Sequence, residues 1–142
     1  ASIDPDYVDS LYAMTQAEDN IQFKGLFPHE KLGEVLAGLD VLVVPSQWHE
    51  NNPRVIQEAF AAKVPVIASN VGGIAEFIEH GINGLLFDHS SVDDLKVQID
   101  RIRTEPDLLP QLKQGIRSVK TVEEEMNEIV GIYQTLVSDK NQ

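Results

Sequence analysis

Short runs of aliphatic residues alternate along this chain with segments of helical periodicity, and this alternation restricts the fold more than any other feature. Residues 41–44 and 64–68 are continuous apolar runs, which are typical of strands covered on both faces. Residues 28–38 and 53–62, which precede and separate the two runs, place apolar side chains at the spacing of a helix. Strands that alternate with helices form a parallel sheet with helices on both faces. We therefore expect an α/β fold built on a Rossmann-like sheet.

Weaker signals place further elements on either side of this centre. Pro5 is typical of a helix start, residues 21–24 favour a short strand, and Gly84–Phe87 favours another. Beyond that strand the chain becomes helical. Ser91 caps one apolar-striped segment, and Thr121 forms a capping-box pattern with the glutamate three residues further on. The C-terminal region is therefore expected to be helical.

The composition excludes several classes of function. The 142 residues carry a formal net charge of −12, whereas nucleic acids and anionic membranes both require a basic surface. The chain has no cysteine and its histidines show no ligand spacing, so we expect no metal site and no cofactor other than a donor substrate. No apolar run reaches the length of a membrane span. We expect one cytoplasmic domain that covers residues 1–142.

The loop at residues 45–54 joins an expected strand to an expected helix. Ligands of parallel sheets bind at such loops, beyond the carboxyl ends of the strands. Asn52 is suited to cap the helix, and Pro53 suits its first position. Backbone N–H groups at this helix start should then face the loop and form an anion site that suits a diphosphate.

Two glutamates accompany this loop. Glu50 lies in the loop itself, and Glu58 lies in the helix beside Ile56 and Phe60, so we expect Glu58 to be partly buried. A partly buried carboxylate needs a hydrogen-bond partner, which vicinal sugar hydroxyls would supply. Trp48 has two interpretations: it stacks on a sugar, or it anchors the loop on the domain.

A second loop, residues 69–76, contains the pair Gly72-Gly73. Paired glycines let a ligand approach the backbone and leave their N–H groups unscreened, although such a pair is also common in plain turns. Glu76 falls in the first turn of the next helix, where the helix dipole favours a carboxylate.

The order of these features is more specific than any one of them. The residues that carry the pattern are, in chain order, Pro45-Ser46, Glu50, Glu58-Ala59, residues 64–69, Gly72-Gly73, Glu76, Gly81 and residues 83–87. This pattern resembles the C-terminal domain of the large family of retaining glycosyltransferases with two Rossmann-like domains, the glycosyl transferases group 1. The detailed resemblance runs from about residue 21 to residue 87.

The resemblance implies the C-terminal half of a GT-B fold that binds a nucleotide-diphosphate sugar. In the full-length enzyme the sugar would pass to an acceptor hydroxyl with retention of anomeric configuration. The acceptor, a sugar or a lipid in polysaccharide or glycolipid biosynthesis, would bind an N-terminal domain. Membrane association of such a longer enzyme stays open.

The resemblance also implies roles for individual residues. Glu50 would be the catalytic carboxylate that holds donor-sugar hydroxyls and stabilises charge near the reacting carbon, and Glu58 would bind the ribose. The other positions implied to contact the donor are the amides around Asn52, Arg54 and Val55, then Gly72 and Gly73 beside the sugar, and more weakly Gly25 and Leu26 beside the base.

Two departures from the family pattern affect these expectations. Family members carry an arginine and a lysine early in this domain that grip the diphosphate, but here no arginine precedes Arg54 and the only earlier lysines are Lys24 and Lys31. The first strands of the domain and the acceptor-binding domain are also missing from the pattern. We therefore expect an N-terminally truncated domain that is a poor catalyst alone.

Other interpretations stay open at this level. One is a non-catalytic nucleotide-sugar-binding module, and another is a sugar epimerase with the GT-B fold. A phosphorylase is disfavoured because no lysine lies in a loop suited to pyridoxal phosphate, and a receiver domain is disfavoured because Asp40 precedes its strand. Taken without their context, Glu50 and Glu58 would be solvated surface residues, and Arg54 is equally suited to a surface salt bridge.

Overall fold

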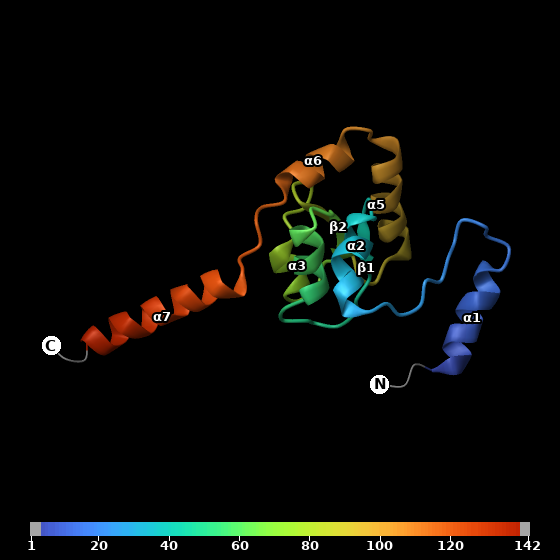
Figure 1. Cartoon of the computed structure of the whole chain (residues 1–142). Coiled ribbons are helices and arrows are strands. Elements are labelled where there is room, and N and C mark those ends of the chain that lie inside the picture. Colours follow the sequence, from blue (N-terminus) through green and yellow to red (C-terminus); the bar gives the residue numbers. More distant parts are fainter. Residues whose placement is uncertain (1–3, 140–142) are drawn as a thin grey trace.

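The computed structural model describes residues 4–139, and at its centre lies a three-stranded parallel sheet (Figure 1). Strands β1 (Leu42–Val44), β2 (Val66–Ser69) and β3 (Gly84–Phe87) lie side by side in chain order. Val43 pairs with Ile67, and Ile67 pairs with Leu85. The expected α/β fold with a parallel sheet is confirmed.

Helices connect and flank these strands. Their bounds are α1 (Pro5–Thr15), the 3₁₀ helix η1 (His29–Lys31), α2 (Leu32–Ala37), α3 (Arg54–Ala61), α4 (Ile74–Phe77), α5 (Val92–Thr104), α6 (Leu108–Gly115) and α7 (Val122–Asp139). The expected helix at residues 28–38 thus has a 3₁₀ first turn. Parallel neighbours need crossover connections, and α3 and α4 supply them between β1 and β2 and between β2 and β3.

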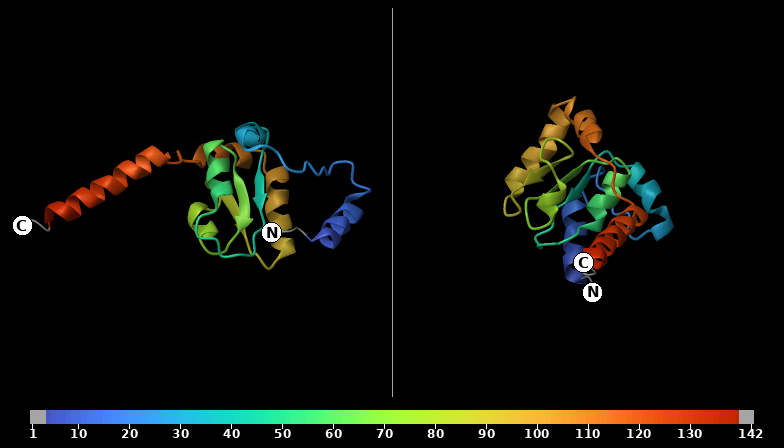
Figure 2. Two further views of the ribbon diagram at one scale, coloured as in Figure 1. Left: turned by 60° about the horizontal axis from the view of Figure 1, so that its bottom comes forward. Right: turned by 90° about the vertical axis from the view of Figure 1, so that its left-hand side faces the viewer.

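The core has two halves, one on each face of the sheet. On one face, Val66 and Ala68 of β2 pack with Ile56 and Phe60 of α3, and Ile74 of α4 joins them. On the other face, the buried side chains are Ile67, Leu85, Phe87, Leu108 and Leu112, and Leu95 and Ile102 of α5 pack against them. Figure 2 shows α3 and α5 on opposite sides of the strands. This arrangement confirms that helices cover both faces.

Two expectations about strands were wrong. Residues 41–44 were expected to be covered on both faces, but β1 is an edge strand of this sheet and Val43 is 39% exposed. Residues 21–24 form no strand. A strand requires a hydrogen-bonded neighbour, and here Phe23 packs against Tyr12 of α1 instead, with ring centroids 4.3 Å apart.

Helices α1 and α7 project from opposite sides of the compact part in Figure 1. The capping box that begins α7 is formed, because Thr121 Oγ1 accepts from the Glu124 N–H (3.2 Å) and the Glu124 carboxylate accepts from the Thr121 N–H (2.7 Å). The apolar side of α7 is exposed, including Met126 and Tyr133. Within residues 4–139, no helix combines the length and the hydropathy that a membrane span requires.

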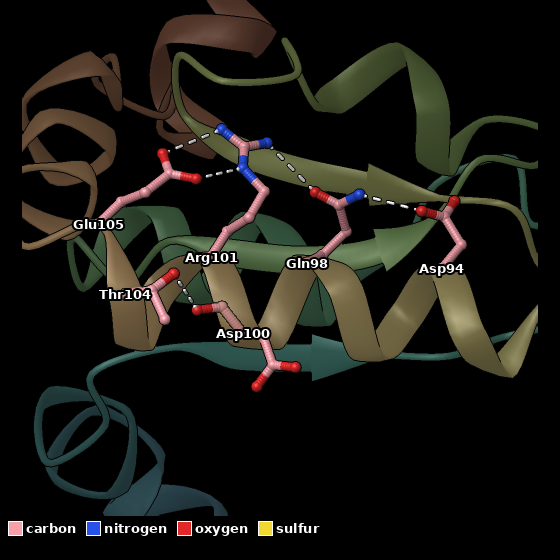
Figure 3. Close-up of polar contacts among 6 residues, drawn as sticks. All are labelled: Asp94, Gln98, Asp100, Arg101, Thr104 and Glu105. Carbon is pink, nitrogen blue, oxygen red and sulfur yellow. Dashed lines mark hydrogen bonds and ion pairs between the residues drawn. The ribbon is translucent and has the colours of Figure 1, made fainter.

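A row of polar side chains runs along α5 (Figure 3). The Gln98 amide donates to Asp94 at 3.0 Å, Arg101 donates to Gln98 at 3.3 Å, and Arg101 also donates to Glu105 at 2.8 Å. These residues are three or four positions apart, which places them on one side of the helix. The row lets Gln98 be buried in the fold with its polar atoms satisfied.

Asp94 connects this row to the sheet. Its second carboxylate oxygen accepts the backbone N–H of Asp88, just after β3, at 2.7 Å. The Asp88 N–H first, and then the Gln98 amide, hold the pKa of Asp94 below its usual value. The ionised carboxylate therefore stabilises the junction between β3 and α5.

We predict that Asp94→Asn lowers the melting temperature at neutral pH. Because the pKa is depressed in the folded protein, the stabilisation is present above the unfolded pKa and is lost as the pH falls through the folded value, below about pH 4. The difference in melting temperature between the parent and Asp94→Asn should therefore become smaller in acid. Asp93→Asn is the matched control, since Asp93 makes no side-chain hydrogen bond within residues 4–139. A gap that is independent of pH, measured by thermal denaturation, would contradict this account.

Candidate functional site

Two loops meet at the carboxyl edge of the sheet, as the sequence predicts. The loop after β1 and the loop after β2 are joined by a 2.8 Å hydrogen bond from the N–H of Gly73 to the carbonyl oxygen of Glu50. Gly72 has a φ of +50°, and a Cβ added to it would lie 2.9 Å from the Cα of His49. A Cβ on Gly73 would lie 2.5 Å from the Glu50 carbonyl oxygen. The two glycines are therefore required for the close approach of the two backbones.

This contact corrects one expectation about the glycine pair. Both N–H groups were expected to be unscreened and available to a ligand, but the Gly73 N–H is used by Glu50. A backbone donor that already has a partner is not free for another acceptor. Gly73 therefore positions Glu50, and its role beside a sugar stays a prediction.

Ser46 contributes a contact that sequence reasoning missed. Its hydroxyl donates to the Glu50 carboxylate at 3.3 Å and accepts the backbone N–H of Trp48 at 3.3 Å. The Glu50 N–H in turn donates to the Trp48 carbonyl oxygen at 3.0 Å. A serine at the start of a loop, two residues before the N–H it binds, is the sequence signal of such a turn. The hydroxyl fixes the direction of the Glu50 side chain.

Helix α3 begins differently from the sequence expectation. Pro53 is the N-cap residue, with no side-chain capping bond, and Asn52 does not cap the helix. The Asn52 side chain instead accepts a hydrogen bond from Gln57. As a result, the N–H groups of Arg54 and Val55 make no hydrogen bond within residues 4–139. Unsatisfied amides at a helix N-terminus favour an anion.

Two charged side chains accompany these amides. Glu58 is half-buried, as expected, and its carboxylate has no hydrogen-bond partner among the described residues. Arg54 is exposed and takes part in no ion pair within the described part of the chain, so the surface salt bridge is not formed. The ion pairs of the described residues involve other cations, among them Arg117 with Glu79 at 3.2 Å and Lys120 with Glu128 at 2.7 Å. Arg54 is thus available to an anion at the start of α3.

The exposure of Trp48 excludes one of its two interpretations and leaves the stacking on a sugar as a prediction. Its side chain is 81% exposed, so it is not an anchor packed on the domain. The base-contact candidates pack against little: Leu26 is fully exposed, and nothing lies within 4 Å of a Cβ placed on Gly25. Their contact with a base stays a prediction.

A cleft of about 520 Å³ borders the first loop. It lies between α3 and the segment that connects α6 to α7, and its lining includes Asn51, Asn52, Gln57, Phe77, Arg117 and Lys120. Sequence reasoning did not find this cleft, because its walls come from segments that are distant along the chain.

Comparison with known proteins decides the family. The profile described as "Glycosyl transferases group 1" matches residues 4–119. The chain belongs to the glycosyl transferases group 1 family. One relative, the GDP-mannose-dependent alpha-mannosyltransferase of Corynebacterium glutamicum, is 38% identical over 80 residues, which is 56% of this chain and 19% of that protein.

Solved structures of glycosyltransferase type share the architecture of this group 1 chain. Sucrose-phosphate synthase of Thermosynechococcus elongatus superposes with a TM-score of 0.78 at 26% identity, covering 98% of this chain and 38% of that one. Anabaena Alr3699/HepE in complex with UDP-glucose gives a TM-score of 0.70 at 26% identity, covering 78% of this chain and 31% of that one. The chain spans about a third or less of the length of the first curated relatives it matches.

We predict that Gly73→Ala destabilises this group 1 domain by about 1–3 kcal/mol, because the new methyl overlaps backbone atoms that cannot rotate away. Gly33→Ala is the matched control: Gly33 lies in α2 with open space around it, so alanine should be neutral or stabilising by up to about 1 kcal/mol. Chemical denaturation of both variants measures the difference. Equal effects of the two substitutions would mean that the loops do not meet as described.

Proposed function

We propose that this chain is the nucleotide-sugar-binding part of a retaining glycosyltransferase. The observation that carries the proposal is the junction of the two loops, where Gly73 holds Glu50 and α3 begins with two unsatisfied amides. Membership of the group 1 family supports glycosyl transfer, and the related Anabaena protein has been crystallised with UDP-glucose.

In this proposal the start of α3 holds the diphosphate. The N–H groups of Arg54 and Val55 and the exposed Arg54 guanidinium donate to phosphate oxygens. As the bond between the sugar and the diphosphate breaks, negative charge grows on the leaving phosphate, and these fixed donors stabilise it. The site thereby supplies local positive potential within a protein of net charge −12.

The two glutamates have different roles. The half-buried Glu58 carboxylate has no partner among the described residues, and it accepts hydrogen bonds from the ribose hydroxyls. Glu50, oriented by the Ser46 hydroxyl, binds the donor sugar and stabilises the positive charge of an oxocarbenium-like transition state. The acceptor hydroxyl then adds to the face from which the diphosphate departs and gives its proton to the leaving diphosphate, so that the anomeric configuration is retained.

Glu58→Ala should weaken nucleotide binding to this chain by roughly ten- to hundred-fold, since a hydrogen bond to a charged group contributes about 1.5–3 kcal/mol. Titration calorimetry or ligand-observed NMR with UDP, GDP and ADP measures the change. Glu34→Ala is the matched control, because Glu34 is an exposed helical glutamate in α2. Equal affinities of parent and Glu58→Ala would remove Glu58 from the site.

Glu50→Gln should lower kcat by about a hundred-fold or more in a protein that contains both domains, while nucleotide affinity changes little. The glutamine keeps an oxygen for the Ser46 hydroxyl but removes the charge. Steady-state rates and the anomeric coupling constants of the product are the measurements. A product of inverted configuration contradicts the retaining mechanism. Nucleotide binding without any sugar transfer would favour a non-catalytic binding module.

A further inference from the structure

Trp48 is the only tryptophan of the chain, and the function proposed above assigns it no role. Its side chain is 81% exposed, although it lies two residues from Glu50 in the loop after β1. Tryptophan carries a large apolar ring surface and one N–H donor, and at this position both are open to a ligand.

The backbone that carries this indole is held firmly. The Ser46 hydroxyl accepts the Trp48 N–H, and the Trp48 carbonyl oxygen accepts the Glu50 N–H. The next residue, His49, lies against Gly72, where even a methyl group would overlap the His49 backbone. The exposed indole is therefore presented by a fixed turn, and the same serine hydroxyl orients the Glu50 carboxylate.

The chemistry of an exposed indole in the same turn as a carboxylate suits a sugar ring. A hexopyranose has one face of C–H groups, which packs on an aromatic ring, and a rim of hydroxyls, which donate to a carboxylate. The indole N–H can in turn donate to a sugar oxygen. A ligand that lies on Trp48 and reaches Glu50 would satisfy both groups together.

We propose that Trp48 is the stacking platform for the hexopyranose ring that binds next to Glu50. This inference rests on the proposed function, which places the reacting sugar at Glu50. The ring has two possible sources with the same chemistry, the sugar of the nucleotide donor and a free glycoside that occupies the acceptor position.

The single tryptophan makes a direct test available. Fluorescence excited beyond the tyrosine band reports on Trp48 alone, and an exposed indole should be strongly quenched by acrylamide. We expect UDP-glucose or GDP-mannose to shift the emission to the blue and to protect it from acrylamide. UDP and GDP alone should leave both quantities unchanged.

The experimental arms separate the two sources of the ring. Protection by the nucleotide sugar but not by the nucleotide assigns the platform to the donor sugar. Protection that requires methyl α-glucoside together with UDP or GDP assigns it to an acceptor sugar. In either case ligand-observed NMR should show that Trp48→Ala weakens the sugar contact several-fold, and that Trp48→Phe restores most of it. The melting temperature of both variants should match the parent, because the side chain is exposed.

Two outcomes overturn the inference. One is an emission that no sugar changes, whether or not the nucleotide binds. The other is equal protection by the bare nucleotide and its sugar conjugate, which would mean that the indole contacts the base. Glu58-dependent nucleotide binding with an unresponsive Trp48 would reject the platform and leave the proposed function standing. Absence of nucleotide binding in the NMR titration would count against the proposed function itself.

Discussion

At the carboxyl edge of the sheet, the N–H of Gly73 donates to the carbonyl oxygen of Glu50 across 2.8 Å, and the arrangement of the site depends on this contact. It joins the loops of two neighbouring parallel strands, whose carboxyl ends meet at one edge. Side chains at positions 72 and 73 would push the loops apart. The bond therefore fixes the backbone from which Glu50 and Trp48 extend. The Ser46 hydroxyl then binds the Glu50 carboxylate and the backbone N–H of Trp48.

The electrostatics of the site are local. With a net charge of −12, the chain cannot attract a diphosphate through its overall field. In the proposed site the diphosphate is held by the two unsatisfied amides at the start of α3 and by Arg54, which has no ion-pair partner among residues 4–139. Such donors act over short distances and are already in place before a ligand arrives, which is the property that transition-state stabilisation requires.

The distribution of exposed apolar surface is uneven. The three strands and helices α2 to α6 enclose both halves of the core, whereas the apolar sides of α1 and α7 are exposed. The chain also covers only part of each protein to which it was compared. The candidate site, by contrast, is assembled from elements that pack within the described residues.

Much of the fold was predictable because its signals are local. Aliphatic runs, helical spacing and the capping residues Ser91 and Thr121 each act over a few residues, and each produced the expected element. The order of Glu50, Glu58 and Gly72-Gly73 likewise predicted two loops at one sheet edge.

The remaining features were decided by tertiary structure. Residues 21–24 have strand propensity, but pairing needs a neighbour, and Phe23 packs on Tyr12 instead. Asn52 has a capping side chain, but Gln57 engages it. The partner of the Gly73 N–H and the exposure of Trp48 depend on which backbone and which side chains lie opposite them in space.

The sequence by itself determined the elements and the residues that carry the chemistry. Only the packing of distant segments decided which donors, faces and charges remain free for a ligand, because hydrogen bonding and burial are settled by neighbours in space.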